Sequence, residues 1–496
     1  MDPARGARVN ASNSRRSSTP AERPKTRTPR RFTKSASTTK SASTTCAAKA
    51  LLVSLVFACA TTVYAELRLL DAGQYHACAV RMGDGIVGEL VCWGSNDKGQ
   101  CGDEDSTTFV TPLTTPTKVI GIAESVKLVR VGQSHSCALM SSGDVMCWGD
   151  NWAGQCGVDP ATTEIIRVPR KVVGLPSPAT HLAVGASHTC AALQGGGVMC
   201  WGFGTDGRLG YGNVDGQNIP TPHAVIGITD SVTSFDADYG TTCALLANAS
   251  LWCWGENRFG GAGYGVVASD NTVAKAYVPV QVDLSGVSGE ITSVATGFWH
   301  TCATTDAGSL YCWGYNAYNQ VGYASTDHSG CPYTVTPTSC TATPRLVANI
   351  AGVTSVSAGT SHTCATLADG GARCWGWTGN GGNIWGILGD GTTASTGTHS
   401  YVPKVVTRTG NPSPTDLGNA TAVVLGDNFA CVEMRDRTVE CWGDNNYGQL
   451  GDPAYTSQSA SSSRTVPGLV TYRRTCTCCE AKLLSVGLGK KGECVA

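Results

Sequence analysis

Seven times along this 496-residue chain a cysteine is followed, at a near-constant distance, by the triplet Cys-Trp-Gly. A frame that recurs seven times predicts a repeat architecture with one small unit per copy. It argues against a single catalytic centre, because catalysis needs one site and this frame occurs seven times. The cysteine pairs are Cys78–Cys92, Cys137–Cys147, Cys190–Cys200, Cys243–Cys253, Cys302–Cys312, Cys364–Cys374 and Cys431–Cys441.

Each pair fits a disulfide across a β-hairpin. The midpoint between Cys137 and Cys147 is Ser142, so the two cysteines face each other across an antiparallel pair. Opposed residues in a non-hydrogen-bonded pair are about 4.5 Å apart at Cα, near the lower end of disulfide reach. Four regular copies place glycine just past the midpoint, where a three-residue hairpin loop needs a left-handed residue. Two copies have Ala249 or Arg437 there, and we expect those turns to close differently.

Zinc is the alternative ligand for the same cysteines. His135 stands two residues before Cys137, but the matching residue is Thr241 in the fourth copy and Phe429 in the seventh. A fourth ligand is not evident in any copy. We therefore expect disulfides, no metal site and no cofactor-binding residues, with the histidines packed in strands opposite a glycine such as Gly149. The five histidines are His76, His135, His188, His300 and His362.

The N-terminal 65 residues have the composition of a targeting segment rather than of a folded domain. Residues 1–45 are basic and poor in large apolar side chains, which predicts a disordered leader. Residues 46–65 are predicted to be a signal peptide or a signal anchor, because the apolar run 50–65 follows a basic segment and ends in Val63-Tyr64-Ala65. An uncleaved segment 50–65 would be a membrane anchor, and a plastid transit peptide is the third interpretation. All three place the repeats outside the cytosol, which suits disulfides.

The near-zero net charge of −1 conceals an uneven distribution. Residues 1–49 contain 12 basic and 2 acidic side chains, and the remainder contains 24 basic and 35 acidic ones. The repeat region is therefore mildly acidic. This argues against nucleic acid as a partner, since phosphate backbones attract basic surfaces.

The full repeat reads, with variation, Val-x-x-x-Gly-x-x-His-Thr-Cys-Ala, then Cys-Trp-Gly-x-Asn-x-x-Gly-Gln-Leu-Gly-Asp and Pro-x-x-Val. The first cysteine recurs after 53 to 67 residues, which is the length of a four-stranded blade. These motifs resemble the regulator-of-chromosome-condensation repeat family, in its disulfide-rich, secreted-type form. The resemblance implies an all-β, seven-bladed β-propeller of four-stranded antiparallel blades over residues 66–472, with one hairpin disulfide per blade. The recurring tryptophan is expected to pack in the core or between blades.

Departures from the repeat mark candidate binding loops. The fifth repeat has an insertion, His328 to Thr343, in which Cys331 and Cys340 are expected to pair. The sixth has a loop rich in tryptophan and glycine, from Trp377 to Trp385. Aromatic side chains in such loops are suited to anchor a partner. The candidate binding residues are Tyr333, Trp377 and Trp385.

Other cysteines and two sequons leave alternatives open. Cys101 and Cys156 replace a repeat leucine, so each is either a buried substitute or half of a bridge between blades. Residues 473–496 form a cysteine-rich tail that pairs either internally or with another chain. Asn248 and Asn419 begin N-glycosylation sequons. The tail cysteines are Cys476, Cys478, Cys479 and Cys494.

The sequence favours a non-enzymatic, extracytoplasmic propeller that binds a protein or surface ligand. It would be secreted or lie on the extracellular face of a membrane, with an organelle lumen as the alternative. The family's founding nuclear member suggests guanine-nucleotide exchange on a small GTPase as the alternative function. Ultraviolet sensing, known from a plant member, would need clustered tryptophans before the repeat histidine, and only Trp299 stands there.

Overall fold

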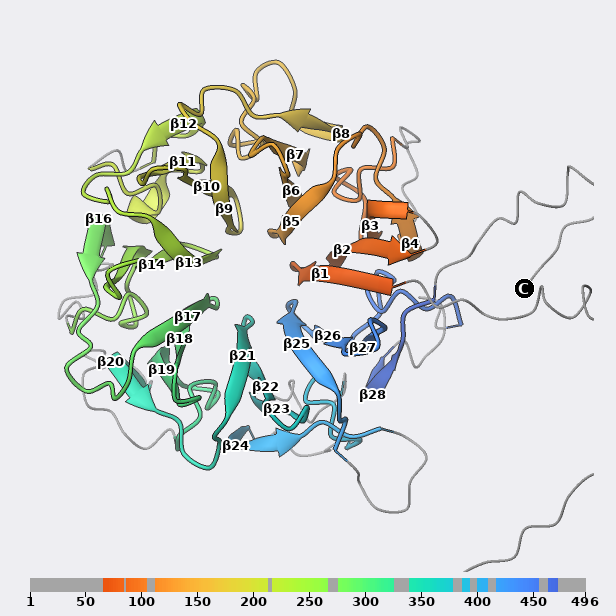
Figure 1. Ribbon diagram of the computed structural model, residues 1–496, viewed down its shortest axis with the longest axis vertical. Coiled ribbons are helices and arrows are strands. Elements are labelled where there is room, and N and C mark those ends of the chain that lie inside the picture. The colour runs from red at the N-terminus through yellow and green to blue at the C-terminus, as the bar shows by residue number, and fades with distance from the viewer. Residues whose placement is uncertain are drawn as a thin grey trace, which may run out of the picture. The chain divides into compact units, whose positions relative to one another are not determined.

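The protein is described by a computed structural model. The described residues are 66–83, 86–104, 112–212, 216–265, 275–324, 339–377, 386–392, 399–408, 416–454 and 463–471. They form seven four-stranded antiparallel sheets, arranged as blades around a common axis (Figure 1). The predicted all-β, seven-bladed propeller is therefore confirmed. No helix among these residues combines the length and the apolar character needed to cross a bilayer.

Each blade is built from four strands that are consecutive in the chain. Blade one comprises β1 (Glu66–Ala72), β2 (His76–Gly83), β3 (Ile86–Gly94) and β4 (Leu113–Lys118). Blade two comprises β5 (Val126–Val131), β6 (His135–Met140), β7 (Val145–Asp150) and β8 (Ile165–Lys171). Blade three comprises β9 (Ala179–Val184), β10 (His188–Leu193), β11 (Val198–Gly202) and β12 (Ile219–Ala224), with the short 3-10 turn η2 (Thr205–Gly207).

The same order continues around the ring. Blade four comprises β13 (Val232–Asp238), β14 (Thr241–Leu246), β15 (Leu251–Glu256) and β16 (Lys275–Gln281). Blade five comprises β17 (Ile291–Thr296), β18 (His300–Thr305), β19 (Leu310–Tyr315) and β20 (Cys340–Leu346). Blade six comprises β21 (Val353–Ala358), β22 (His362–Leu367), β23 (Ala372–Gly376) and β24 (Ser400–Val405). Blade seven comprises β25 (Ala420–Leu425), β26 (Phe429–Met434), β27 (Val439–Gly443) and β28 (Arg464–Leu469).

The cysteines pair across the second and third strands of every blade. In blade two Cys137 lies opposite Cys147 and His135 lies opposite Gly149, as the hairpin register predicts. The paired Cα atoms are 4.1 or 4.2 Å apart in all seven copies, and the sulfur pairs are buried. One hairpin disulfide per blade is thus part of the fold. Because each bridge closes a short local loop, it stabilises one hairpin and leaves the ring to be held by packing between blades.

The prediction that two hairpin turns close differently was wrong. Ala249 and Arg437 adopt the left-handed conformation of glycine at that position, with φ of 64° and 70° against 87° at Gly143. In each turn the side chain of the preceding residue stabilises this conformation. Asn248 Oδ1 accepts hydrogen bonds from the amide and hydroxyl of Ser250, and Asp436 makes the same pair of contacts with Thr438. Such side-chain contacts offset the cost of a left-handed residue other than glycine.

The repeat tryptophan joins every blade to the one before it. All seven indoles are fully buried, and each Nε1 donates to a main-chain carbonyl in the turn that follows the third strand of the preceding blade. Trp93 of blade one donates to Gln449 of blade seven over 2.9 Å, which closes the ring. The other six donor–acceptor pairs are Trp148–Gln100, Trp201–Gln155, Trp254–Arg208, Trp313–Gly261, Trp375–Gln320 and Trp442–Ile387.

Two details of the sequence interpretation change. The proposed insertion His328–Thr343 is too long, because β20 begins at Cys340 and contributes the outer strand of blade five. Cys101 and Cys156 are free thiols in the buried core, and each Sγ donates to a main-chain carbonyl of its own turn. They therefore replace the repeat leucine and do not bridge blades.

Candidate functional site

The repeat histidines belong to the seams between blades. His135 Nε2 lies 3.0 Å from Thr189 Oγ1 of the next blade, and that hydroxyl donates to the carbonyl of Gln155 over 2.9 Å. Because the hydroxyl uses its hydrogen on the carbonyl, the imidazole Nε2 must carry the proton. Burial lowers the pKa of His135 to about 3, so the ring is neutral. Equivalent contacts join His76 to Ser136, His188 to Thr242 and His300 to Thr363.

The two seams that flank blade seven lack this relay. Phe429 replaces the histidine of blade seven and packs in one buried apolar cluster with Ala77 of blade one, which replaces the hydroxyl residue. Blade six keeps His362, but blade seven has Ala430 where a hydroxyl would be. Both ring nitrogens of His362 are buried without a hydrogen-bond partner. The histidines, like the tryptophans, are thus structural residues, and the candidate site must be sought elsewhere.

The innermost strands end around a cavity on the propeller axis. Its lining comes from the ends of β1, β5, β9, β13, β17, β21 and β25 and from the loops that follow them, and its volume is about 150 Å³. The strands surround the axis in Figure 1. Four carboxyls line this cavity with one basic side chain, Arg130. The carboxyls are those of Asp71, Asp236, Asp238 and Asp427.

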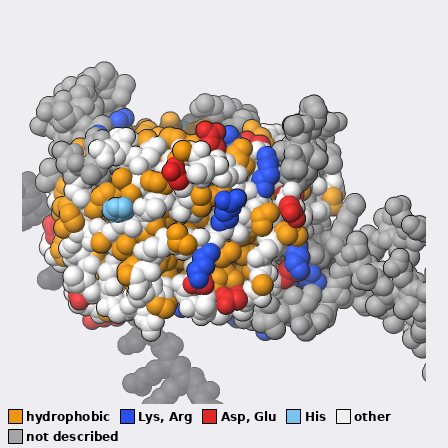
Figure 2. Space-filling view, turned by 90° about the horizontal axis from the view of Figure 1, so that it is seen from above, with side chains coloured by type: hydrophobic (Ala, Val, Ile, Leu, Met, Phe, Trp, Pro, Cys, Tyr) orange, Lys and Arg blue, Asp and Glu red, His pale blue; other side chains and the backbone are white. Residues whose placement is uncertain are grey.

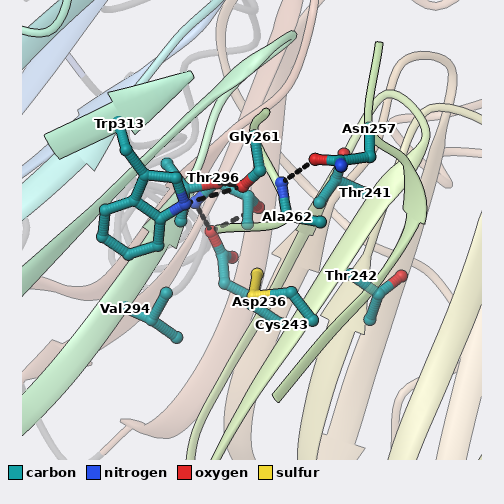
Figure 3. Close-up of a disulfide and its surroundings, with 12 residues drawn as sticks. Asp236, Thr241, Thr242, Cys243, Asn257, Gly261, Ala262, Val294, Thr296 and Trp313 are labelled. Carbon is teal, nitrogen blue, oxygen red and sulfur yellow. Dashed lines mark hydrogen bonds between the residues drawn. A yellow bond between two sulfur atoms is a disulfide. The ribbon is translucent and has the colours of Figure 1, made fainter. Parts of the chain in front are cut away.

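Two of the four aspartates join neighbouring blades. Asp71 accepts a hydrogen bond of 2.8 Å from the amide of Val131. Asp236 accepts from both the amide and the hydroxyl of Thr296, over 2.7 and 3.0 Å (Figure 3). Figure 3 also shows Trp313 bonded to Gly261 at the same seam. These two aspartates therefore have a structural role as well as a charge at the cavity.

The cavity raises the pKa of all four carboxyls. Burial raises the pKa of Asp238 to about 7, and repulsion from Asp427, Asp236 and Asp71 adds to this effect. Burial raises the pKa of Asp71 to about 6 although the nearby Arg130 opposes the shift. Burial is also the main cause of the raised pKa values of Asp236 and Asp427. Because burial disfavours the charged form of these carboxyls, a bound cation would favour the ionised carboxylates.

Asp238 is present because blade four departs from the repeat. The other six blades have glycine at this position, where a Cβ would collide with the residue three positions later, with the main-chain carbonyl of the next blade, or with both. At Gly73 the nearest atom is the carbonyl oxygen of Gly132, at 1.9 Å. At Gly132 a Cβ would lie 2.7 Å from the ring of His135, and at Gly426 it would lie 2.0 Å from the ring of Phe429. Blade four has the smaller Thr241 in place of the ring. The hydroxyl of Thr241 donates to the carbonyl of Glu256. Blade four therefore lacks the obstacle of a ring, and Asp238 places a carboxyl at the cavity.

A continuous series of half-buried aromatic rings begins at the cavity wall and crosses blades four to six. Tyr239 and Phe298 both line the cavity, with ring centroids 3.9 Å apart. Phe298 contacts Trp299 at 4.2 Å, and Trp299 contacts Tyr315 at 5.4 Å. Their loops follow the first and third strands of a blade, which end on the same face in an antiparallel sheet. We call this set the aromatic row, and its members are Tyr239, Phe298, Trp299, Phe259, Tyr315, Tyr318 and Trp377.

Arg208 holds one end of the aromatic row in place. This side chain replaces the repeat glutamine of blade three and is buried, with an ion pair of 3.0 Å to Asp206. Its Nη1 donates to the carbonyl of Tyr239 over 2.8 Å, and its guanidinium lies 5.9 Å from the centroid of the Tyr239 ring. It also lies 4.9 Å from the ring of Phe203. A buried cation therefore positions the tyrosine at the cavity wall.

The sequence-based binding residues are only partly within the described structure. Trp377 is half-buried and extends the aromatic row, with its ring 6.0 Å from that of Tyr318. Tyr333 and Trp385 lie outside the described residues, as does Cys331. Cys340 takes part in a disulfide. The two sequon asparagines, Asn248 on the hairpin tip of blade four and Asn419 just before β25, are exposed.

Sequence analysis missed most of the aromatic row and all of the cavity. The missed residues occupy variable positions of the repeat, either before the histidine or just after Cys-Trp-Gly. A usable signal was present, because aromatic residues at these positions accumulate in blades four to six: Tyr239, Phe298, Trp299, Phe259, Tyr315, Tyr318 and Trp377. No metal-binding group of histidine, cysteine, aspartate and glutamate occurs among the described residues.

Two models of the regulator of chromosome condensation (RCC1) repeat match this chain. One matches residues 126–156, 179–208, 291–320, 353–381 and 420–449, and the other matches residues 88–139, 142–192 and 307–366. The five segments matched by the first model each begin at or near the first strand of a blade in the structure. The chain belongs to the RCC1 repeat family.

Curated relatives are similar over part of this RCC1 repeat protein. The mitochondrial RCC1 domain-containing protein RUG3 of Arabidopsis thaliana is 30% identical over 269 residues, which are 53% of this chain and 57% of the relative. The ultraviolet-B receptor UVR8 of the same plant is 31% identical over 237 residues, 47% of this chain and 50% of the relative. The secretion-regulating guanine nucleotide exchange factor of Bos taurus is 27% identical, over 64% of this chain and 67% of the relative. The chain thus spans about half the length of the first two.

A solved structure shares the fold. The crystal structure of Prp20p from Saccharomyces cerevisiae, described with its binding properties to Gsp1p and histones, aligns with a TM-score of 0.60 and 24% identity. The alignment covers 73% of this chain and 81% of Prp20p. At this identity the likeness supports the RCC1 propeller fold alone.

Proposed function

We propose that this RCC1 repeat protein is a non-enzymatic, extracytoplasmic propeller that binds another protein through the face carrying the aromatic row. The observation that carries the proposal is the row itself, a continuous series of half-buried rings that leads to an acidic cavity. Rings of this kind dominate the energetics of protein interfaces because they bury much area at little entropic cost. The rest of the repeat is occupied with holding the blades together.

The cysteine chemistry supports an oxidising compartment. Seven buried hairpin disulfides, one in each blade, are unusual in the reducing cytosol. The apolar run 50–65 behind a basic leader supports export, to the outside of the cell or to an organelle lumen. Six of the seven bridges close a loop of about eleven residues, for which the chain-entropy model gives roughly 2–3 kcal/mol.

Intact-mass analysis of the chain purified from its natural source tests the compartment. We expect the mass to rise by two hydrogens per bridge on reduction, for seven or more bridges, and the leader to be missing or the protein to be membrane-bound. Glycans at Asn248 or Asn419 would add to the mass and be removed by glycosidase. Fully reduced cysteines in the native protein would contradict an extracytoplasmic location.

Binding to intact cells of the source organism tests the interaction face. The labelled propeller should bind their surface, and the variant Phe298→Ala/Tyr318→Ala should lose most of that binding. Tyr401→Ala is the matched control, because Tyr401 is an exposed aromatic residue on β24, the outermost strand of blade six. Equal loss in both variants would contradict the choice of face.

Guanine-nucleotide exchange is the alternative function, and it is supported by the relative from Bos taurus that carries this activity in its name. Stopped-flow release of a fluorescent guanine nucleotide from small GTPases tests it directly. We expect no acceleration by the oxidised propeller. Accelerated release that survives reduction of the disulfides would replace the proposed function.

A further inference from the structure

We propose that the cavity end of the aromatic row recognises a basic side chain, lysine or arginine, of the bound partner. The inference rests on the proposed protein-binding function and names the chemistry of the partner. It combines two features that the structure places side by side. Tyr239 and Phe298 line the cavity with their rings in mutual contact, and Asp236 and Asp238 line the same cavity.

The aromatic pair at the cavity wall is the second feature that favours a cation. Tyr239 and Phe298 come from neighbouring blades, are both half-buried, and their ring planes meet at 36°. Aromatic faces carry negative potential, and they attract an ammonium or guanidinium group within about 6 Å of the centroid. Arg208 already uses one such interaction, at 5.9 Å from Tyr239. Both rings also line the cavity, so a cation that enters the cavity would lie beside them.

Charge at the cavity selects a cation over a neutral or anionic group. Among the described residues that line the cavity, four carry carboxyls and Arg130 is the only basic one. Burial is the main cause of the raised pKa values of Asp71 and Asp238, so a positive charge placed in the cavity would favour their ionised forms. A lysine or arginine would supply that charge, whereas an acidic peptide would be repelled.

Size favours the end of a side chain over a larger ligand. The cavity volume of about 150 Å³ accepts an ammonium or guanidinium head with its adjacent methylenes. The rest of the partner would lie on the aromatic row, from Trp299 towards Trp377. The rim of the propeller is a poor alternative, because basic and acidic side chains are interspersed on the part seen in Figure 2.

Peptide selection on the full oxidised propeller tests the proposal. A phage library of random dodecamers serves as the probe, so the ligand need not be known. We expect selected peptides to be enriched in lysine or arginine, and synthetic versions to lose affinity about 5-fold to 30-fold when that residue becomes norleucine. This range corresponds to about 1–2 kcal/mol for a desolvated cation–π contact.

Conservative variants separate recognition from folding. Asp236→Asn and Asp238→Asn keep an oxygen that accepts the same amide hydrogen bond and remove the charge, while Phe298→Leu keeps apolar volume and removes the ring. Each should weaken the selected peptide, and Asp369→Asn, at an exposed hairpin turn, should not. Circular dichroism and thermal melting of each variant report whether the propeller remains folded.

Three results would overturn the proposal. They are selected peptides without basic residues, a peptide affinity unchanged by Asp238→Asn and Phe298→Leu, and binding of neutral saccharides on a glycan array with no peptide enrichment. The last would assign the aromatic row to sugar recognition. None of them would bear on disulfide content or on export, so failure here is distinguishable from failure of the proposed function.

Discussion

Blades two and four show how one repeat serves both architecture and recognition. Blade two keeps the histidine, and His135 reaches across the seam to Thr189. Blade four has lost it, and Thr241 turns back to the carbonyl of Glu256 in its own blade. Asp238 stands in place of Gly132 of blade two, where a Cβ would lie 2.7 Å from the ring of His135. Blade four has thus lost a seam contact through one substitution and gained a carboxyl at the cavity through a second.

The largest expected effect is acid unfolding through the histidine seams that blade four lacks. Burial lowers the pKa of His76, His135, His300 and His362 to about 3, and that of His188 well below its usual value. Unfolded histidine has a pKa of about 6.5, so the unfolded chain binds more protons between these values. The free energy of unfolding should be highest above pH 6.5 and fall towards pH 3, by about 1.4 kcal/mol for each pKa unit by which a buried histidine is shifted.

Urea titrations from pH 7 to pH 4 measure this loss. The variant His135→Phe should flatten the pH dependence, and Thr241→Ser in blade four should leave it unchanged. Asp71 and Asp238 act in the opposite direction, because raised pKa values add stability at low pH that disappears as pH rises through about 6 to 7. A stability that increases on acidification would show that the aspartates outweigh the histidines.

The tryptophan seam should be equally strong in both blades. Trp148 and Trp254 are each fully buried and each donates to a main-chain carbonyl of the preceding blade. Truncation to alanine should cost about 3–5 kcal/mol in either case, since it leaves a large cavity and an unpaired carbonyl. Chemical denaturation compares the two variants. A cost at Trp254 less than half of that at Trp148 would mean that blade four is already loosened at its seam.

Restoring the repeat histidine and glycine in blade four should stabilise the propeller and weaken binding of the partner. Thr241→His alone is expected to destabilise by about 1–3 kcal/mol, because the ring would meet the Cβ of Asp238 as a Cβ at Gly132 would meet the ring of His135. Thr241→His/Asp238→Gly should remove the clash and place a histidine near Thr301, the blade-five hydroxyl that already donates to Gly261. A double-mutant cycle by thermal unfolding measures this coupling. Additive effects would contradict the steric explanation for Asp238.

The smallest expected effect concerns the seam between blades six and seven. Ala430→Thr should supply the hydroxyl that His362 lacks and stabilise the propeller by about 1 kcal/mol, as for one buried hydrogen bond. Ala77→Thr is the control, because Phe429 faces that position and offers no hydrogen bond. Differential scanning calorimetry of the two variants would reveal the difference, and a gain at Ala77 equal to that at Ala430 would contradict it.

Local regularities were readable in the chain, because a β-hairpin is governed by near neighbours. The cysteine spacing predicted the register of Cys137 with Cys147, and the repeat period predicted four strands per blade. The hairpin at Ala249 was misjudged because the side chain of Asn248 supplies what glycine would have supplied. Even this failure has a local cause.

The sequence by itself determined the propeller, the number of blades and the hairpin disulfides, since each depends on spacings within one repeat. Only the tertiary structure decided that His135 bonds to Thr189, 54 residues away, and that seven tryptophans link the blades. It also decided that Asp71 and Asp238, far apart in the chain, share one cavity. Closing a ring brings the same position of every repeat to one axis, and what gathers there depends on all seven blades at once.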